Sequence, residues 1–311
     1  MASHSSEVKN LYERFEQGFE RFVKPIVDSE LGPYTDPVRS IHEGFYLRRF
    51  RSGIPIAVSD ALSHPNAPYV LLGASQELMF SALLVEDDYL DNDSRRGVLE
   101  AAHIHYGEKP SLLAASIAVA IADRLVADAD RKSRLSGELM RTHIKAKQDV
   151  YESFAIEVDG TSLDVEGVEQ LHTLKTAQGF ASIVGAGLIA QTSGLEPEVL
   201  GPFAEHTGIA GQITNDLHDL HKYAVLRGYS DIENSYPTMP LALARERWGD
   251  LDGVPQADLE RILSEKWIID RCVTIADEHL NRAREAIERA HPNVRPILEL
   301  WIDANRYSPS S

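Results

Sequence analysis

The 311-residue sequence contains a single cysteine, Cys272, which excludes an internal disulfide framework and a cysteine-rich zinc site. It is also poor in positive charge, because 31 Lys and Arg stand against 48 Asp and Glu, for a formal net charge of -17. Such a chain lacks the basic face that non-specific binding to nucleic acid or anionic lipid requires. We therefore expect a cytoplasmic protein with no nucleic-acid partner. An anionic small substrate remains open, since bound metal ions can invert the local field.

Long hydrophobic runs are scarce as well. The opening segment, MASHSSEVKNLYERF, has no apolar core of the kind found in signal peptides. The longest uncharged run, residues 176–195, is as long as a membrane span but is rich in Gly, Ala, Ser, Thr and Gln. We interpret it as a buried helix and expect no stable membrane insertion.

Signals for β-structure are missing too, with no Asn-Gly hairpin between alternating strands and no βαβ rhythm. Apolar residues instead recur at steps of three and four, beginning with Val8, Leu11 and Phe15. Further helical segments are expected at 69–90, 111–129, 131–158, 165–195, 197–225, 236–248, 256–290 and 294–304. Only short loops with Gly and Pro interrupt them, at 29–37 and 249–255. The sequence therefore predicts one all-α domain over residues 1–311, with about ten helices.

A first acidic cluster closes the apolar segment at 69–90. Asp87, Asp88 and Asp91 stand at i, i+1 and i+4, so Asp87 and Asp91 share one helical face. Carboxylates crowded at a helix C-terminus repel one another and oppose the macrodipole, whereas a site for hard divalent cations needs them. Arg95 and Arg96 follow, with planar forks suited to phosphate. The cluster predicts a metal and diphosphate site; the plain alternative is an acidic helix end before a charged loop.

A second cluster, residues 212–219, reads QITNDLHD and repeats the pattern. Asn215 and Asp219 again stand at i and i+4 on an apolar segment. Alone this spacing is common on solvated helices. Two such helices facing one another would place a metal-lined cavity mouth between them.

These two clusters resemble the aspartate-rich motifs of trans-isoprenyl diphosphate synthases. Residues 87–97 resemble DDxxD followed by RRG, and residues 212–219 resemble the second motif, with Asn215 where Asp is usual. Lys175-Thr176 resembles the family's KT motif, and residues 230–241 resemble its SDL…TLPL segment. The resemblance implies an all-α bundle around a deep central cavity, usually assembled as a homodimer.

The resemblance also implies chemistry and residue roles. Three Mg²⁺ ions and basic side chains would bind an allylic diphosphate of C10–C20, whose C–O bond ionises in an apolar cavity that excludes water. Metal binding would fall to Asp87, Asp91, Asn215 and Asp219; allylic diphosphate binding to Arg95, Lys175 and Arg227; and second-substrate binding to Arg48 and Arg96. Catalysis would fall to Asp87, Asp88, Asp91, Lys175 and Asp216, and Gln212 of the second motif would contact the substrate.

The sequence departs from the family pattern at the site for isopentenyl diphosphate. Where the family carries GGKRxRP, residues 43–49 have Phe45 in place of Lys and keep Arg48. Phe80 replaces a His or Gln, and Tyr236 replaces the Lys of GKxTLP. Losing two charge-assisted hydrogen bonds weakens diphosphate binding by roughly two to four powers of ten. We expect the allylic half of the site to be retained and the acceptor half to be rebuilt.

The sequence leaves four functions open. They are transfer of a prenyl group to an unidentified acceptor, cyclisation of the substrate as by a terpene synthase, ordinary chain elongation, and the role of a non-catalytic partner subunit. The cyclase alternative has two further resemblances. Asn215, Asp219 and Tyr223 have the spacing of the NSE metal motif, and Arg306-Tyr307 resembles a C-terminal RY pair in which the Arg binds diphosphate.

Overall fold

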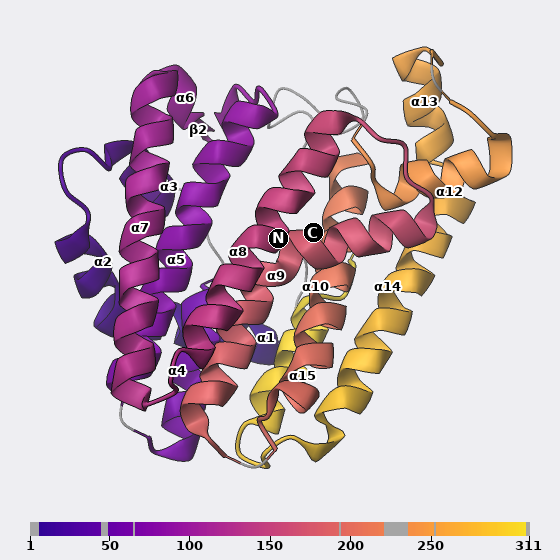
Figure 1. Ribbon diagram of the computed structural model, residues 1–311. Coiled ribbons are helices and arrows are strands. Elements are labelled where there is room, and N and C mark those ends of the chain that lie inside the picture. Colours follow the sequence, from indigo (N-terminus) through magenta and orange to yellow (C-terminus); the bar gives the residue numbers. More distant parts are fainter. Residues whose placement is uncertain are drawn as a thin grey trace.

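The computed structural model describes residues 6–44, 49–64, 66–192, 194–220, 236–251 and 253–308. These residues form a helical bundle, which confirms the all-α expectation (Figure 1). Its α-helices are α1 (Ser6–Gly18), α2 (Lys24–Glu30), α3 (Asp36–Gly44), α4 (Phe50–Leu62), α5 (Asn66–Leu90), α6 (Ala102–His105), α7 (Glu108–Ser133), α8 (Glu138–Asp159), α9 (Val165–Ala190), α10 (Pro197–His218), α12 (Met239–Trp248), α13 (Gln256–Leu263), α14 (Lys266–Ala286) and α15 (Arg295–Ala304).

The helices begin and end where local chemistry dictates. Asp164 caps α9, because its carboxylate accepts a 2.9 Å hydrogen bond from the amide of Gly167. Proline stands in the first turn of α10, where its missing amide proton costs nothing. Gly160 follows α8 in the left-handed conformation (φ 67°), which a glycine adopts without strain. These local signals set the ends of α8, α9 and α10, and α10 carries the second acidic cluster.

Several elements differ from the expectation, since α2, α3 and α6 lie where no helix was predicted. Residues 50–62 form α4, which the periodicity did not predict because every residue from Ser52 to Ser59 is buried and no polar face marks the helix. The expected helix at 256–290 is divided into α13 and α14 at Ser264–Glu265, where the backbone turns extended without any Gly or Pro.

A short hairpin also interrupts the helices. The strands β1 (Arg95–Arg96) and β2 (Leu99–Glu100) pair antiparallel, with Gly97 at φ 63° in the turn between them. The hairpin lies beside the carboxyl end of α5, at the top of Figure 1. The sequence predicted only a loop here, since strands of two residues leave no alternating pattern.

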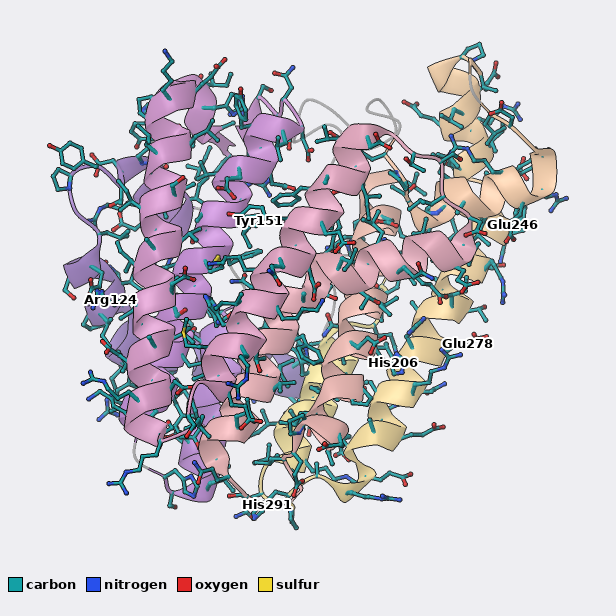
Figure 2. The ribbon with its side chains drawn as sticks, in the orientation of Figure 1. Arg124, Tyr151, His206, Glu246, Glu278 and His291 are labelled. Atoms are coloured by element: carbon teal, nitrogen blue, oxygen red, sulfur yellow. The ribbon has the colours of Figure 1, made fainter. Side chains whose placement is uncertain are left out.

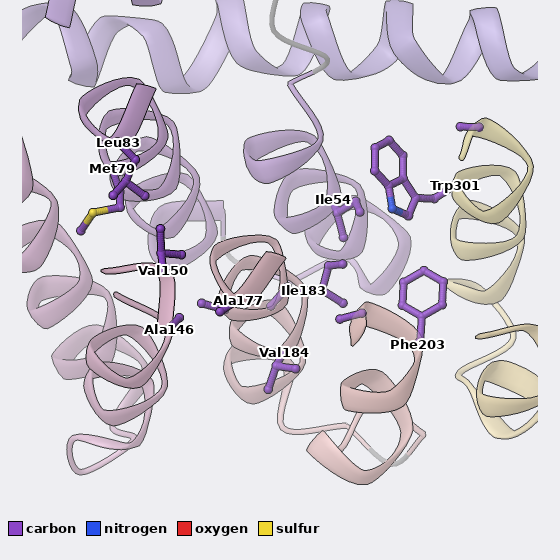
Figure 3. Packing of buried hydrophobic residues seen from close by; sticks show 14 of the residues in the cluster. Ile54, Met79, Leu83, Ala146, Val150, Ala177, Ile183, Val184, Phe203 and Trp301 are labelled. Carbon is purple, nitrogen blue, oxygen red and sulfur yellow. The ribbon is translucent and has the colours of Figure 1, made fainter. Parts of the chain in front are cut away.

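Helix α9 lies at the centre of the bundle, because it packs against α4, α5, α8, α10 and α12. Figure 3 shows buried side chains of α9 together with those of other helices of the bundle, among them Ile54, Met79, Val150, Phe203 and Trp301. Helix α5 is long and apolar enough to cross a membrane, but 78% of its apolar window is buried inside the protein. We therefore read α5 as a core helix of the bundle.

Candidate active site

The two acidic clusters occupy the carboxyl ends of two helices on either side of α9. Asp87 and Asp88 lie in the last turn of α5, and Asp91 follows it. Asn215 and Asp216 lie in the last turn of α10, and Asp219 is its C-terminal cap residue. Because α9 packs against both helices, its own residue Lys175 lies in the element that joins the two clusters.

Arg96 orders the first cluster. It is buried, and its Nε donates to Asp88 Oδ1 (2.6 Å) while Nη2 donates to Asp87 Oδ2 (2.9 Å). Asp88 has no exposed surface, so its charge depends on Arg96 for compensation. The guanidinium predicted to bind the second substrate is thus engaged with the aspartates of the motif. Arg95, its neighbour in the hairpin, is exposed and donates weakly to the carbonyl of Val98 (3.4 Å).

Asp91 faces both negative and positive charge. Burial, and then the neighbouring carboxylate of Asp87, raise the pKa of Asp91 to about 8, while Lys175 opposes that shift. Tyr236 donates its phenol hydrogen bond to Asp91, and burial together with this carboxylate raises the pKa of Tyr236. Lys175 forms an ion pair with the buried carboxylate of Glu157 on α8. Residues from four separate stretches of chain therefore meet around one carboxylate.

This environment fits a divalent cation. Two carboxylates that resist ionising together are relieved by a positive ion between or beside them. Within the described ranges no three Asp, Glu, His or Cys side chains form a ready-made ligand set. Magnesium does not require one, because it usually takes one or two carboxylates together with waters and substrate phosphate oxygens. Asp87 and Asp91 meet that smaller requirement.

In the second cluster, Asn215 and Asp216 differ in solvent exposure. Asn215 is exposed, and its amide lies 3.5 Å from Gln212 Oε1. Asp216 is buried; its Oδ2 accepts from the backbone amide of Met239 (2.8 Å) and lies 3.3 Å from His172 Nε2. Asp216 therefore joins α10 to α9 and to the start of α12. The other predicted ligand on this side, Asp219, is half-buried.

On the acceptor side, Phe80 is packed beneath a cation. The guanidinium carbon of Arg51 lies 3.3 Å from the centre of the Phe80 ring. Phe45 and Arg48, predicted for the same half of the site, and Arg227, predicted for the allylic diphosphate, lie outside the described residues.

The C-terminal end of the chain reaches the second cluster. The hydroxyl of Thr214 donates to the backbone carbonyl of Asn305 (3.3 Å), and the ring of Tyr307 lies 5.5 Å from that of His218. The Nε of Arg306 lies 3.6 Å from Asp277 Oδ1 on α14, with 54% of the arginine side chain exposed. The structure thus brings the RY pair next to α10 but shows Arg306 paired with a surface carboxylate.

Three residues of this region were not predicted. Glu157 and His172 give no signal in the sequence, because their partners Lys175 and Asp216 are identified only by tertiary packing. Arg51 had a weak signal: it belongs to the run LRRFRSG, where three arginines crowd the start of α4. The resemblance to the family motif points to Arg48 in that run and not to Arg51.

Comparison with known proteins confirms the resemblance. The family model described as polyprenyl synthetase matches residues 47–262. A farnesyl diphosphate synthase of Bacillus subtilis is 27% identical over 213 residues, covering 64% of this chain and 72% of the relative. A geranylgeranyl diphosphate synthase of Sulfolobus acidocaldarius is 25% identical over 309 residues, covering 88% and 92%.

Solved structures share the fold. A polyprenyl synthase from Caulobacter crescentus, crystallised with calcium and isoprenyl diphosphate, superposes with a TM-score of 0.82 at 19% identity, covering 98% of each chain. A geranylgeranyl pyrophosphate synthetase from Pyrococcus horikoshii gives a TM-score of 0.81 at 19% identity over 96% of this chain and 99% of that one. The helical bundle is therefore the one these proteins use.

Proposed function

Since the chain belongs to the polyprenyl synthetase family, we propose that it is a magnesium-dependent prenyltransferase acting on an allylic isoprenyl diphosphate of C10–C20. The observation that carries this proposal is the surroundings of Asp91. Its carboxylate interacts electrostatically with that of Asp87 and with Lys175, and it accepts a hydrogen bond from Tyr236. An ordinary surface cluster would leave these carboxylates in water, with no reason to gather a lysine and a phenol from distant parts of the chain.

Asp87 and Asp91 hold metal on one side of the site, and Asn215 and Asp219 on the other, for three Mg²⁺ ions in all. Bound Mg²⁺ supplies positive charge to the leaving diphosphate. Arg96 keeps Asp88 and Asp87 in place through hydrogen bonds of 2.6 and 2.9 Å. The relative from Caulobacter crescentus, with calcium and isoprenyl diphosphate, supports this pairing of a divalent cation with the ligand class.

Arg95, Lys175 and Arg227 bind the allylic diphosphate. Lys175 is paired with Glu157, and 28% of its side chain is exposed, so its ammonium can turn toward an arriving phosphate oxygen. As the C–O bond breaks, these cations stabilise the developing negative charge on the diphosphate. Buried apolar side chains keep water from the allylic cation until a nucleophile attacks.

The acceptor half of the site is altered, with Phe45, Phe80 and Tyr236 at positions where the family carries polar or cationic ligands. We propose an acceptor other than isopentenyl diphosphate. Ordinary elongation is the competing proposal, and the names of the relatives favour it. A non-catalytic partner subunit is disfavoured, because Asp87 and Asp91 keep an electrostatic environment suited to metal.

A terpene cyclase is the second candidate function, and one contact favours it. Thr214, inside the second cluster, donates to the carbonyl of Asn305, which brings Arg306 and Tyr307 to the end of α10. A cyclase needs no acceptor, so its activity would not depend on the cationic ligands that are missing on the acceptor side. In this alternative Arg306 leaves Asp277 to bind diphosphate.

Mass spectrometry of products separates these proposals. Purified protein receives Mg²⁺ and each of dimethylallyl, geranyl, farnesyl and geranylgeranyl diphosphate, with and without isopentenyl diphosphate. Hydrocarbon or alcohol from one allylic diphosphate alone identifies a cyclase. A product longer by five carbons, formed only with isopentenyl diphosphate, identifies ordinary elongation and removes the non-standard acceptor. Consumption of the allylic diphosphate only after a cell extract is added identifies another acceptor.

We also propose a homodimer, supported by exposed apolar residues on α7 and α8. Leu113 and Ile117 are exposed on α7, and Ile144, Tyr151 and Val158 recur every seven residues on α8 (Figure 2, where Tyr151 is labelled). Residues with this spacing form one stripe along a helix. A second copy of the chain would cover it. The single-domain organisation over residues 1–311 and the cytoplasmic location stay predictions of the sequence.

A further inference from the structure

Gln178 is a buried glutamine whose side-chain amide has no partner among the described residues. It lies on α9, three residues after Lys175, and only 3% of it is exposed. Both its Oε1 and its Nε2 are buried, and neither forms a hydrogen bond with any described residue. Taking an amide out of water without new hydrogen bonds destabilises the folded chain. An apolar side chain of similar size would avoid this cost, so the stability of the fold does not explain the glutamine.

The contacts of neighbouring residues on α9 show which way Gln178 faces. Residues at i, i+4 and i+7 share one side of a helix, and for Gln178 these are Ser182 and Gly185. The hydroxyl of Ser182 donates to a backbone carbonyl of α4. A Cβ added at Gly185 would lie 2.8 Å from Leu139 of α8 and 3.1 Å from Leu72 of α5. Gln178 therefore faces α4, α5 and α8.

Gln178 lies one helical turn, about 5 Å, from the cation predicted to hold the allylic diphosphate. Lys175, at i−3, shares its side of α9 and acts on the carboxylate of Asp91. Beyond Lys175, α9 runs toward the first half of α5, because Gly185 packs against Leu72. Gln178 is thus on the side of Lys175 away from the acidic cluster. A diphosphate held at Lys175 would place the first carbons of the prenyl chain beside Gln178.

The chemistry of the amide selects its ligand. A prenyl chain is a hydrocarbon and offers neither a hydrogen-bond donor nor an acceptor. The alkene of isopentenyl diphosphate, which attacks in ordinary elongation, offers neither as well. A hydroxyl group supplies both, because it donates one hydrogen bond and accepts through the lone pairs of its oxygen. Next to the reacting carbon, such a group is in position to act as the nucleophile.

We propose that Gln178 binds the nucleophilic hydroxyl of an alcohol or a phenol. This inference rests on the proposed prenyltransferase function and narrows it to transfer onto oxygen. The C–O bond of the allylic diphosphate breaks, and its electron pair leaves with the diphosphate. The acceptor oxygen then bonds to the allylic carbon, and its proton passes to a diphosphate oxygen. Oε1 of Gln178 accepts from the hydroxyl and thereby turns an oxygen lone pair toward that carbon.

Methanol and water serve as the probe acceptors, because each brings a hydroxyl into a small space. Wild type receives Mg²⁺, geranyl or farnesyl diphosphate, and methanol. Mass spectrometry gives the ratio of prenyl alcohol and methyl ether to hydrocarbons, above a blank in EDTA. Gln178→Leu should lower this ratio about 2- to 10-fold, the range for one lost hydrogen bond. An equal ratio in the two proteins, or hydrocarbons as the main wild-type product, would overturn the proposal.

A stability measurement separates ligand binding from a structural role. Because the amide is unpaired, Gln178→Leu should melt about 2–4 °C higher than wild type. A lower melting temperature would identify a structural glutamine and overturn the proposal. Gln178→Met, of nearly the same shape, replaces this variant if circular dichroism shows it to be unfolded.

The matched control is Gln76→Leu. Gln76 is buried on α5, and its Nε2 donates to His143 Nδ1 (3.2 Å). This glutamine has a partner, so its replacement should lower the melting temperature. The ratio of oxygen-containing products to hydrocarbons should stay at the wild-type value.

The proposed function is measured in the same samples, as Mg²⁺-dependent release of diphosphate. No release by folded wild type removes the prenyltransferase together with the role of Gln178. Release by wild type and Gln178→Leu with the same product ratio removes the role of Gln178 alone. A final arm adds isopentenyl diphosphate beside methanol. A main product longer by five carbons would identify ordinary elongation and overturn the hydroxyl acceptor.

Discussion

Arg96 and Asp88 form a buried ion pair whose two members depend on each other. Asp88 has no exposed surface, and Arg96 donates to it at 2.6 Å. Removing one partner of such a pair leaves an uncompensated charge in the interior, which typically costs 3–5 kcal/mol. The same arginine also holds Asp87, so stability and metal binding are coupled through one side chain.

Arg96→Gln should therefore lower the free energy of unfolding by about 3 kcal/mol or more. The double variant Arg96→Gln with Asp88→Asn should recover part of that loss, because the buried charge is gone on both sides. Urea unfolding of the three proteins measures both effects. A double variant less stable than Arg96→Gln alone would show that the two side chains are not a mutually dependent pair.

His42 makes stability depend on pH. It is buried on α3, where burial, and then the charge of Arg49, lower its pKa to about 3 from an ordinary 6.5. Between these values the unfolded chain binds more protons than the folded one, so the free energy of unfolding falls as pH drops below about 6.5. The slope from this residue is at most about 1.4 kcal/mol per pH unit.

Urea unfolding at pH 7, 6 and 5 should show a shallower loss of stability for His42→Gln than for wild type. Burial lowers the pKa of His206 to about 4 as well, so the informative quantity is the difference between the two proteins. His105→Gln, at an exposed histidine, is the matched control and should keep the wild-type slope. Equal slopes for His42→Gln and wild type would contradict the assignment.

At the scale of elements, α9 and α10 hold the two halves of the site at a fixed separation. They meet closely at Gly208, where an added Cβ would lie 2.5 Å from Thr176 Oγ1 and 2.6 Å from Thr176 Cβ. Thr176 follows Lys175, and its hydroxyl donates to the carbonyl of His172 (2.9 Å). A side chain at position 208 would have to displace the turn of α9 that carries the predicted lysine.

Gly208→Ala should lower the free energy of unfolding by about 1–3 kcal/mol, the usual cost of overpacking. It should also weaken Mg²⁺-dependent diphosphate binding, since Lys175 moves with Thr176. Gly201→Ala is the control on the same helix, because its Cβ would meet Phe180 at an ordinary 3.5 Å. That control should be neutral or more stable by up to about 1 kcal/mol, as expected for alanine in a helix. Two equally stable variants would argue against the close contact.

The sequence predicted where the long helices lie better than where one helix ends and the next begins. Helices α5, α9 and α10 were expected because each is a long apolar segment with a clear start or stop. Helix α4 was missed, since uniform burial removes the polar face on which periodicity depends. The break before α14 was missed because neither Gly nor Pro marks it.

At the scale of the whole molecule, the motifs named Asp91, Lys175 and Tyr236, which the structure brings together, but not how these side chains pair. The spacing at Asp87 and Asp91 indicated a metal site on one helix face without any tertiary information. The pairing of Lys175 with Glu157, and of Arg51 with Phe80, joins residues far apart in the chain. No local pattern encodes such contacts, so they became visible only when the helices were packed.

The exposed stripe on α8 predicts self-association. If a second copy covers Ile144, Tyr151 and Val158, light scattering should give twice the 34.5 kDa mass of the chain. Ile144→Glu combined with Val158→Glu should give the mass of one chain, because two charges would be buried without partners. Val98→Glu, at an exposed apolar residue of the hairpin turn, should keep the wild-type mass. A wild type that is monomeric at micromolar concentration would contradict the homodimer.

The most direct test of the central claim is the release of diphosphate from allylic isoprenyl diphosphates by wild type and by Asp87→Ala/Asp91→Ala. We predict release by wild type that requires Mg²⁺ and stops in EDTA, and none by the folded double variant. Wild-type turnover in the double variant, or no release from any C10–C20 allylic diphosphate by folded wild type in Mg²⁺ with isopentenyl diphosphate or cell extract added, would contradict the account.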